Sequence, residues 1–172
     1  IYIRLGRELQ EQLTRLRNEN KTDQLKRVSQ GFELFLKKIS GRKEGNSFNS
    51  LNWVAGTLFG LGAGLDPGGK ETPEEAKEYY RSAAEAYVVI LKRDEKDPSF
   101  APPDADISVE VRLAACLRAL GGYEMAMTRL VSILSQREKR LDVQIEAART
   151  YQDWGQEKPG YYEHAIKGGK KT

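Results

Sequence analysis

Cysteine and histidine are almost absent from this 172-residue chain, which has one of each, Cys116 and His164. One cysteine excludes an intrachain disulfide, and the two residues together are too few for a metal site built from cysteine and histidine. No third group is placed to orient a Cys/His nucleophilic pair. Paired carboxylates such as Glu74 and Glu78 fall on a helix face expected to be solvated, which does not favour acid catalysis. We therefore expect no enzymatic activity, no metal and no cofactor.

Long uninterrupted apolar runs are also missing. The most apolar stretch, residues 48–65, is broken by Asn49 and Asn52, so we expect no membrane span. Within it, Gly56 and Gly60 are four residues apart and predict a close helix crossing inside a core. The six prolines fall in loops or at helix starts, which leaves the helical patterns intact.

Targeting signals are not visible either. No signal peptide can be read, and a lone Cys116 on an apolar helix face fits a reducing compartment, which favours the cytoplasm. The chain starts at Ile1 rather than at methionine. We therefore expect it to be a fragment of a larger protein, with targeting information outside it.

Charge of one sign is never sustained along the chain. Residues 1–44 carry eleven Lys/Arg against six Asp/Glu, residues 45–107 carry six against eleven, and residues 108–172 carry eleven against eight. This alternation is not typical of a continuous phosphate-binding stripe, so nucleic-acid binding is not the leading hypothesis.

One glycine-rich stretch imitates a phosphate loop. Gly64 is followed, after four residues, by Gly69 and Lys70, but Glu71 stands where a magnesium-binding Ser or Thr is required. No strand precedes the motif, and an acidic helix start follows it, which repels phosphate. The acidic segment 94–106 does not have the spacing of an EF-hand loop. Both segments are interpreted as structural loops.

Apolar residues at helical spacing predict helices over most of the chain. The first predicted elements are a helix pair between Leu5 and Ile39, a helix capped by Ser47 and a helix from Pro73 to about Lys92. A central pair is separated by Gly121-Gly122, and its first helix starts near Ile107 and is capped by Asp104 or Asp106. A helix from Leu141 ended by Gly155 and a short final helix over 161–166 follow. Adjacent helical positions point in different directions, so Tyr79 and Tyr80 are not both expected in the core.

A repeat is visible at a lag of 34 residues, at which Ala114 matches Ala148, Leu117 matches Tyr151 and Gly121 matches Gly155. Small residues such as Ala114, Ala126 and Ala148 are expected to be buried where helices cross closely. The spacing of Leu113-Ala114, Leu117, Ala126 and Leu130 resembles the tetratricopeptide repeat (TPR), although Glu110 stands where that family prefers tryptophan.

The resemblance implies an all-α, right-handed α-α superhelix of about four antiparallel helix pairs in a single domain. The units are approximately residues 1–44, 47–97, 107–140 and 141–170. In this family the first helix of each pair lines a concave groove. By position, the lining residues are Trp53, Thr57, Arg112, Ala115, Arg118, Arg149 and Gln152. The three arginines predict a cationic groove that suits an acidic peptide.

These patterns favour a protein–protein interaction module or scaffold that presents its groove to a protein or peptide partner. The alternatives are a helical-repeat RNA binder and an architectural spacer in a larger multidomain protein. An uncovered apolar surface at the end of the array would also allow homo-oligomers through the terminal helices. Changing Arg118 and Arg149 together to glutamate is expected to abolish partner capture with helicity intact.

Overall fold

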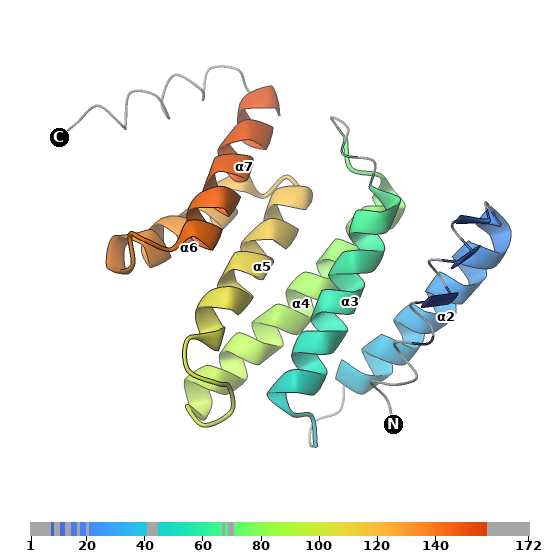
Figure 1. Cartoon of the computed structure of the whole chain (residues 1–172), viewed down its shortest axis with the longest axis horizontal. Helices are drawn as coiled ribbons and strands as arrows, with labels where there is room; N and C mark the ends of the chain where they lie inside the picture. Colours follow the sequence, from blue (N-terminus) through green and yellow to red (C-terminus); the bar gives the residue numbers. More distant parts are fainter. Residues whose placement is uncertain are drawn as a thin grey trace.

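The computed structural model describes residues 21–40, 45–66, 68 and 71–157, together with isolated positions from residue 8 to residue 19. Six helices lie in the continuous ranges, and no strand occurs among the described residues, so the described part of the chain is all-α as predicted. They are α2 (Thr22–Ser40), α3 (Phe48–Leu65), α4 (Glu74–Lys96), α5 (Ala105–Ala119), α6 (Tyr123–Gln136) and α7 (Leu141–Glu157) (Figure 1). The predicted helix over 161–166, with His164, lies outside them.

The helices from α3 to α7 follow one another in space as they do in sequence. α3 packs on α4, α4 on α5, α5 on α6 and α6 on α7, while α7 also contacts α5. In Figure 1, α3 and α5 run in one direction and α4 runs in the opposite direction behind them. α2 packs mainly on α3. Each helix therefore covers an apolar face that its neighbour could not bury alone.

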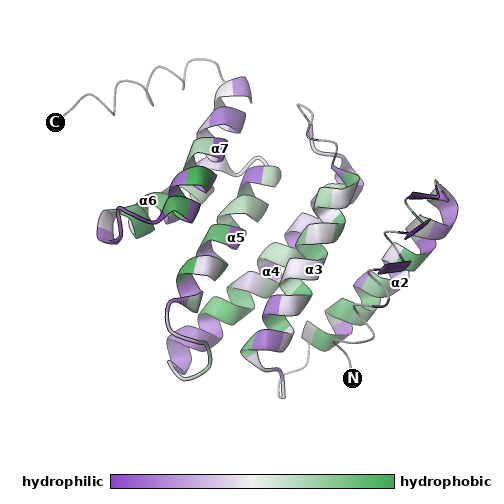
Figure 2. Cartoon of the chain, viewed as in Figure 1, coloured by the Kyte–Doolittle hydropathy of each residue, from purple (hydrophilic) through white to green (hydrophobic). Residues whose placement is uncertain are grey.

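The core consists of two clusters that meet at α5. The first joins α2 to α5 and includes fully buried Phe32, Leu58 and Tyr87, whereas the second joins α5 to α7 through Leu130 and Val143. Figure 2 shows apolar stretches along α3 and α5 and hydrophilic residues in the loops. Within the described ranges, no helix combines the length and apolarity needed to cross a bilayer.

The helix ends match the sequence patterns only in part. Ser47 caps α3 as predicted, because its side chain accepts a hydrogen bond of 3.3 Å from the Ser50 amide. Asp104 precedes α5 but makes no capping hydrogen bond, and its φ of 62° is in the left-handed region. Its carboxylate instead pairs with Arg137 at 2.9 Å. Gly155 does not end α7, which continues to Glu157, and Gly155 is a buried helical residue.

The close crossing of α3 and α4 occurs at Gly62 and not at Gly56 or Gly60. A Cβ on Gly62 would lie 3.1 Å from the carbonyl oxygen of Ala76 and from the Tyr80 ring. Gly60 has nothing within 4 Å of such an atom, and Gly56 faces only side-chain ends at 3.8 Å or more. The spacing of four residues identified the correct helix, but the contact depends on which face of α3 meets α4.

Tyr79 and Tyr80 are both buried, at 2% and 4% exposed, contrary to the prediction. The reason is that α4 packs against α2, α3 and α5, so its covered arc is wider than one stripe. The Tyr80 hydroxyl donates to Asp66 at 3.3 Å. Burial is the main cause that raises the pKa of both phenols to about 12.

α7 presents a different face to the core from the one that the 34-residue repeat predicts. Ala114 and Ala126 are buried as predicted, but Ala148 is exposed and Ala147 takes the buried place. Val143, Ala147 and Thr150, spaced four and three residues apart, form the covered stripe. A lag of 33 residues would have matched the two buried alanines, since one residue rotates a helical position by about 100°.

Candidate functional site

The predicted groove residues come from α3, α5 and α7, but their environments differ. Arg112, Arg149 and Gln152 are exposed, Trp53 and Arg118 are half-buried, and Thr57 and Ala115 are buried. Thr57 and Ala115 are only 3% and 8% exposed, so they offer a partner little side-chain surface. The surface predicted from the sequence is therefore smaller than its list of residues suggests.

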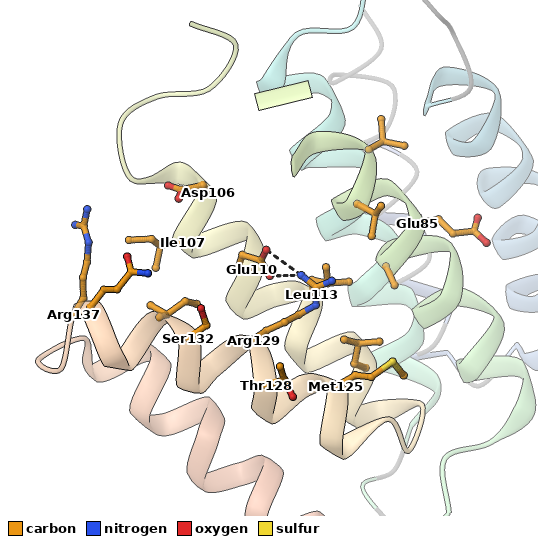
Figure 3. Close-up of a pocket in the computed structure, with 16 residues that line it drawn as sticks. Glu85, Asp106, Ile107, Glu110, Leu113, Met125, Thr128, Arg129, Ser132 and Arg137 are labelled. Atoms are coloured by element: carbon orange, nitrogen blue, oxygen red, sulfur yellow. Dashed lines mark hydrogen bonds and ion pairs between the residues drawn. The ribbon is translucent and has the colours of Figure 1, made fainter. Parts of the chain in front are cut away.

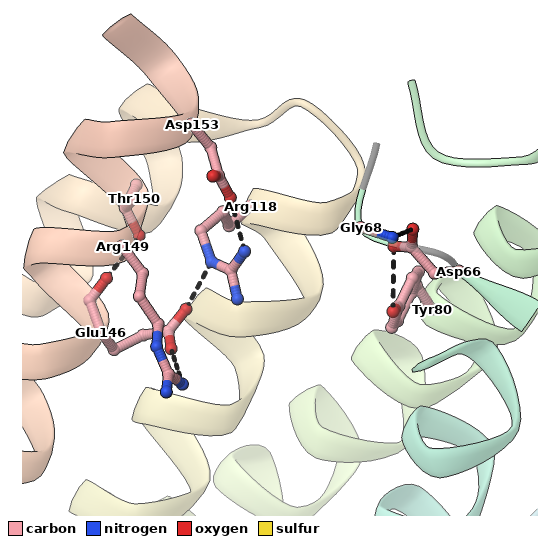
Figure 4. A network of polar contacts seen from close by, with 8 residues as sticks. All are labelled: Asp66, Gly68, Tyr80, Arg118, Glu146, Arg149, Thr150 and Asp153. Atoms are coloured by element: carbon pink, nitrogen blue, oxygen red, sulfur yellow. Dashed lines mark hydrogen bonds and ion pairs between the residues drawn. The ribbon is translucent and has the colours of Figure 1, made fainter. Parts of the chain in front are cut away.

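Arg118 is engaged within the protein and does not face the predicted groove as a free cation. Its Nε donates to Glu146 Oε1 at 2.7 Å, and its Nη1 donates to Asp153 Oδ2 at 2.6 Å (Figure 4). Burial opposes the charged guanidinium, but the hydrogen bonds and attraction of the two carboxylates outweigh it and raise the pKa of Arg118. The network joins α5 to α7, with Glu146 buried at 5% exposed and Arg118 and Asp153 partly accessible to water.

Arg112 is the arginine of the predicted groove that has no ion-pair partner among the described residues. Its Nη1 and the Tyr87 hydroxyl both approach the open side of Gly56, at 3.8 Å and 3.9 Å from the place of a Cβ. The Tyr87 hydroxyl is buried and makes no hydrogen bond with the described residues. Burial raises the pKa of Tyr87 to about 12, although nearby Arg112 acts in the opposite direction. The Arg112 guanidinium is thus close enough to lower the pKa of Tyr87, although the two groups do not form a hydrogen bond.

Tyr87→Phe is expected to raise the free energy of unfolding by about 1 kcal/mol, because it removes a buried hydroxyl that lacks a partner. Tyr80→Phe is the matched control on the same helix. It removes a hydroxyl that donates to Asp66, so a small loss of stability is expected. Urea unfolding followed by circular dichroism measures both. Equal losses in the two variants would show that the Tyr87 hydroxyl has an unseen partner.

A larger groove, which the sequence patterns did not predict, opens between α4 and α6 with α5 as its floor (Figure 3). We call it the α4–α6 groove. Its volume is about 1000 Å³. The apolar part of its lining consists of Ala84, Val88 and Val89 from α4, Ile107, Leu113 and Leu117 from α5, and Met125 and Ile133 from α6. Met125 is 59% exposed, so the groove offers apolar surface that no described element covers.

A polar pair crosses the middle of the α4–α6 groove. Nη1 of Arg129 on α6 donates to both carboxylate oxygens of Glu110 on α5, at 3.0 Å and 2.7 Å. Figure 3 shows the two side chains pointing toward each other between the apolar ends of the groove. The two opposite charges compensate each other, and the pair links α5, the floor of the groove, to the α6 wall.

Carboxylates gather along the α4 side and at one end of the groove. Glu85 and Asp106 line the groove itself, whereas Asp94 and Glu95 line a smaller cavity that adjoins it and shares Asp106. We call these four carboxylates the acidic rim. None of the four has an ion-pair partner among the described residues. Three arginines near them pair with other carboxylates of the chain, Arg129 with Glu110, Arg137 with Asp104 and Arg140 with Asp142, and Lys92 lines the same small cavity as Asp94 and Glu95. The rim is therefore net negative.

The environment of Cys116 disfavours reaction at its thiol. Cys116 is fully buried, and burial, with a smaller contribution from Glu146, raises the pKa of its thiol to about 12. A thiol held neutral in this way is a poor nucleophile. Within the described ranges, no three His, Cys, Asp or Glu side chains are grouped to hold a metal ion.

No protein-family model, curated protein or solved structure matches this chain.

Proposed function

We propose that this chain is a helical-repeat protein-interaction module, with a TPR-like superhelical arrangement, that holds a helical segment of a partner in the α4–α6 groove. The observation that carries the proposal is the open groove of about 1000 Å³ with aliphatic walls and an exposed Met125. Exposed apolar surface bordered by polar residues is typical of protein interaction sites. The serial packing of α3 to α7 and the resemblance to TPR units support the architecture.

A helix is the partner segment that this shape suits best. The walls α4 and α6 each pack on α5, so an added helix between them would continue the same helix-on-helix packing. A helix in a groove inserts apolar residues from one face, at positions i, i+3, i+4 and i+7. A small molecule usually needs most of its surface enclosed, which a groove open along its length does not provide.

The predicted first-helix surface is the weaker docking site. Two of its residues are buried, and Arg118 is engaged with Glu146 and Asp153. Phosphate binding on the α4–α6 groove is disfavoured by the acidic rim, so RNA is not proposed as its ligand. A spacer would need no uncovered apolar groove.

Met125→Glu is expected to weaken the binding of groove-directed helical peptides about tenfold or more, because it places a charge among aliphatic side chains. Such peptides are selected from a displayed library of amphipathic helices against the full chain, and their dissociation constants are then measured by fluorescence anisotropy. Met125 lies in the first turn of α6, where an acidic residue is tolerated, so the fold should persist.

Val131→Glu is the matched control. Val131 is a similarly exposed apolar residue of α6, at 51%, but it does not line the groove. Its substitution should leave peptide affinity within about twofold, since exposed surface changes away from an interface are usually small. The proposal is wrong if the library yields no binder, or if the selected peptides bind the Met125→Glu variant as tightly as the unchanged chain.

A further inference from the structure

We propose that the occupant of the α4–α6 groove is a basic amphipathic helix of a partner protein. This inference rests on the proposed protein-binding role of the groove and adds the chemistry of the partner. Aliphatic residues on one face of the helix would contact the groove walls, and Lys or Arg residues beside that face would contact the acidic rim.

Charge complementarity identifies the basic flank of the partner. Glu85 and Glu95 on α4 and Asp106 on α5 are exposed, and Asp94 is half-buried beside them. The nearby arginines already pair with other carboxylates of the chain, since Arg129 donates to Glu110, Arg137 pairs with Asp104 and Arg140 pairs with Asp142. A basic segment would thus meet unpaired carboxylates, whereas an acidic segment would meet four like charges. Electrostatic complementarity of this kind selects partners and speeds association.

The distribution of apolar residues identifies the pattern of the partner helix. Ile107 lies toward one end of the groove and Met125 toward the other, with the Glu110–Arg129 pair between them (Figure 3). Ile133 and Leu117 add to the apolar lining. Ile107 and Leu117 are ten residues apart on α5, a rise of about 15 Å at 1.5 Å per residue. Positions i and i+11 of a partner helix are separated by about 16 Å, so its apolar anchors are expected about three turns apart.

The position of the acidic rim predicts where the basic residues lie along the partner helix. Asp94 and Glu95 finish α4, Asp106 begins α5, and all three lie around the same end of the groove. Glu85 stands further along the α4 wall, as Figure 3 shows. Most of the basic residues of the partner should therefore lie at the end of its helix that approaches the α4–α5 connection.

The test uses two stapled helical peptides and the full chain. Both peptides carry leucine at i, i+4, i+7 and i+11. One has lysines beside this stripe, and the other has glutamates at the same positions. The lysine peptide is expected to bind about tenfold tighter in fluorescence anisotropy, since four exposed charge contacts can each contribute a factor of about two. Its advantage should shrink as salt is added.

A charge-swapped chain assigns this preference to the rim. Asp94→Lys with Glu95→Lys should reduce or reverse the preference, and cations suit the last turn of α4, so folding is not threatened. The matched control, Glu78→Lys with Glu138→Lys, makes the same change in net charge at exposed positions that do not line the groove, and it should keep the preference.

The outcomes separate the two proposals. Equal binding of both peptides, with loss of both in Met125→Glu, would overturn the basic-helix inference and leave the proposed function standing. Tighter binding of the glutamate peptide would do the same. If the lysine peptide binds the Met125→Glu variant as tightly as the unchanged chain, both proposals are overturned. Self-association of the chain that Met125→Glu abolishes would identify a second copy as the occupant and overturn this inference alone.

Discussion

Arg118→Glu is expected to destabilise the packing of α7 on α5 by about 3 kcal/mol, because it leaves the buried Glu146 carboxylate without its main partner. The substitution would place a third carboxylate beside Glu146 and Asp153, which now share the Arg118 guanidinium. Glu146 is 5% exposed and could not recover its lost contact from water. Chemical unfolding followed by circular dichroism is the measurement.

Arg149→Glu provides the comparison. Arg149 is 63% exposed and lies 3.9 Å from Glu146, so its loss should change stability by no more than about 0.5 kcal/mol. Arg118→Met combined with Glu146→Leu should recover most of the stability, because it removes both buried charges. An unchanged unfolding midpoint in Arg118→Glu would show that the network contributes nothing. Loss of partner capture in the Arg118→Glu, Arg149→Glu double variant would thus report unfolding and not a binding contact.

Gly62→Val is expected to lower the free energy of unfolding by about 1–3 kcal/mol, the typical cost of overpacking a closely packed core. The added side chain would lie 3.1 Å or less from the Ala76 carbonyl oxygen, a backbone atom that cannot swing aside. α3 and α4 would have to separate along their contact. Thermal unfolding of the full chain measures the effect.

Gly60→Ala tests the opposite sign on the same helix. An added Cβ at Gly60 meets nothing within 4 Å. Replacing glycine by alanine inside an exposed helical turn favours the helix by up to about 1 kcal/mol. If the two variants shift the unfolding temperature in the same direction, the crossing of α3 and α4 does not depend on Gly62.

The sequence predicted what depends on neighbouring residues. Helical periodicity located the helices from 48 to 157, and the Ser47 cap was recognised because its hydrogen bond spans only three residues. Cys116 was correctly interpreted as buried. The rotation of α7 about its axis was harder to predict from the sequence. Ala147 and Ala148 are identical neighbours, and only the packing of α7 on α5 and α6 decides which of them is buried.

The candidate site was less predictable because it depends on residues far apart in the chain. Arg118 meets carboxylates 28 and 35 residues away, and no local pattern distinguishes this from an exposed arginine. The α4–α6 groove depends on how far α5 separates the two helices. One signal was present in the sequence: Glu110, at the position where the resembled family prefers tryptophan, lies in that groove beside Arg129.

Leu117 connects the α4–α6 groove to the stability of the whole array. It contacts both core clusters, so it is the side chain through which the α2–α5 half meets the α5–α7 half, and it also lines the α4–α6 groove. In serially packed arrays, cooperativity depends on the interfaces between neighbouring units. An occupant seated on Leu117 would contact α4, α5 and α6 together, so its binding is expected to couple the unfolding of the two halves.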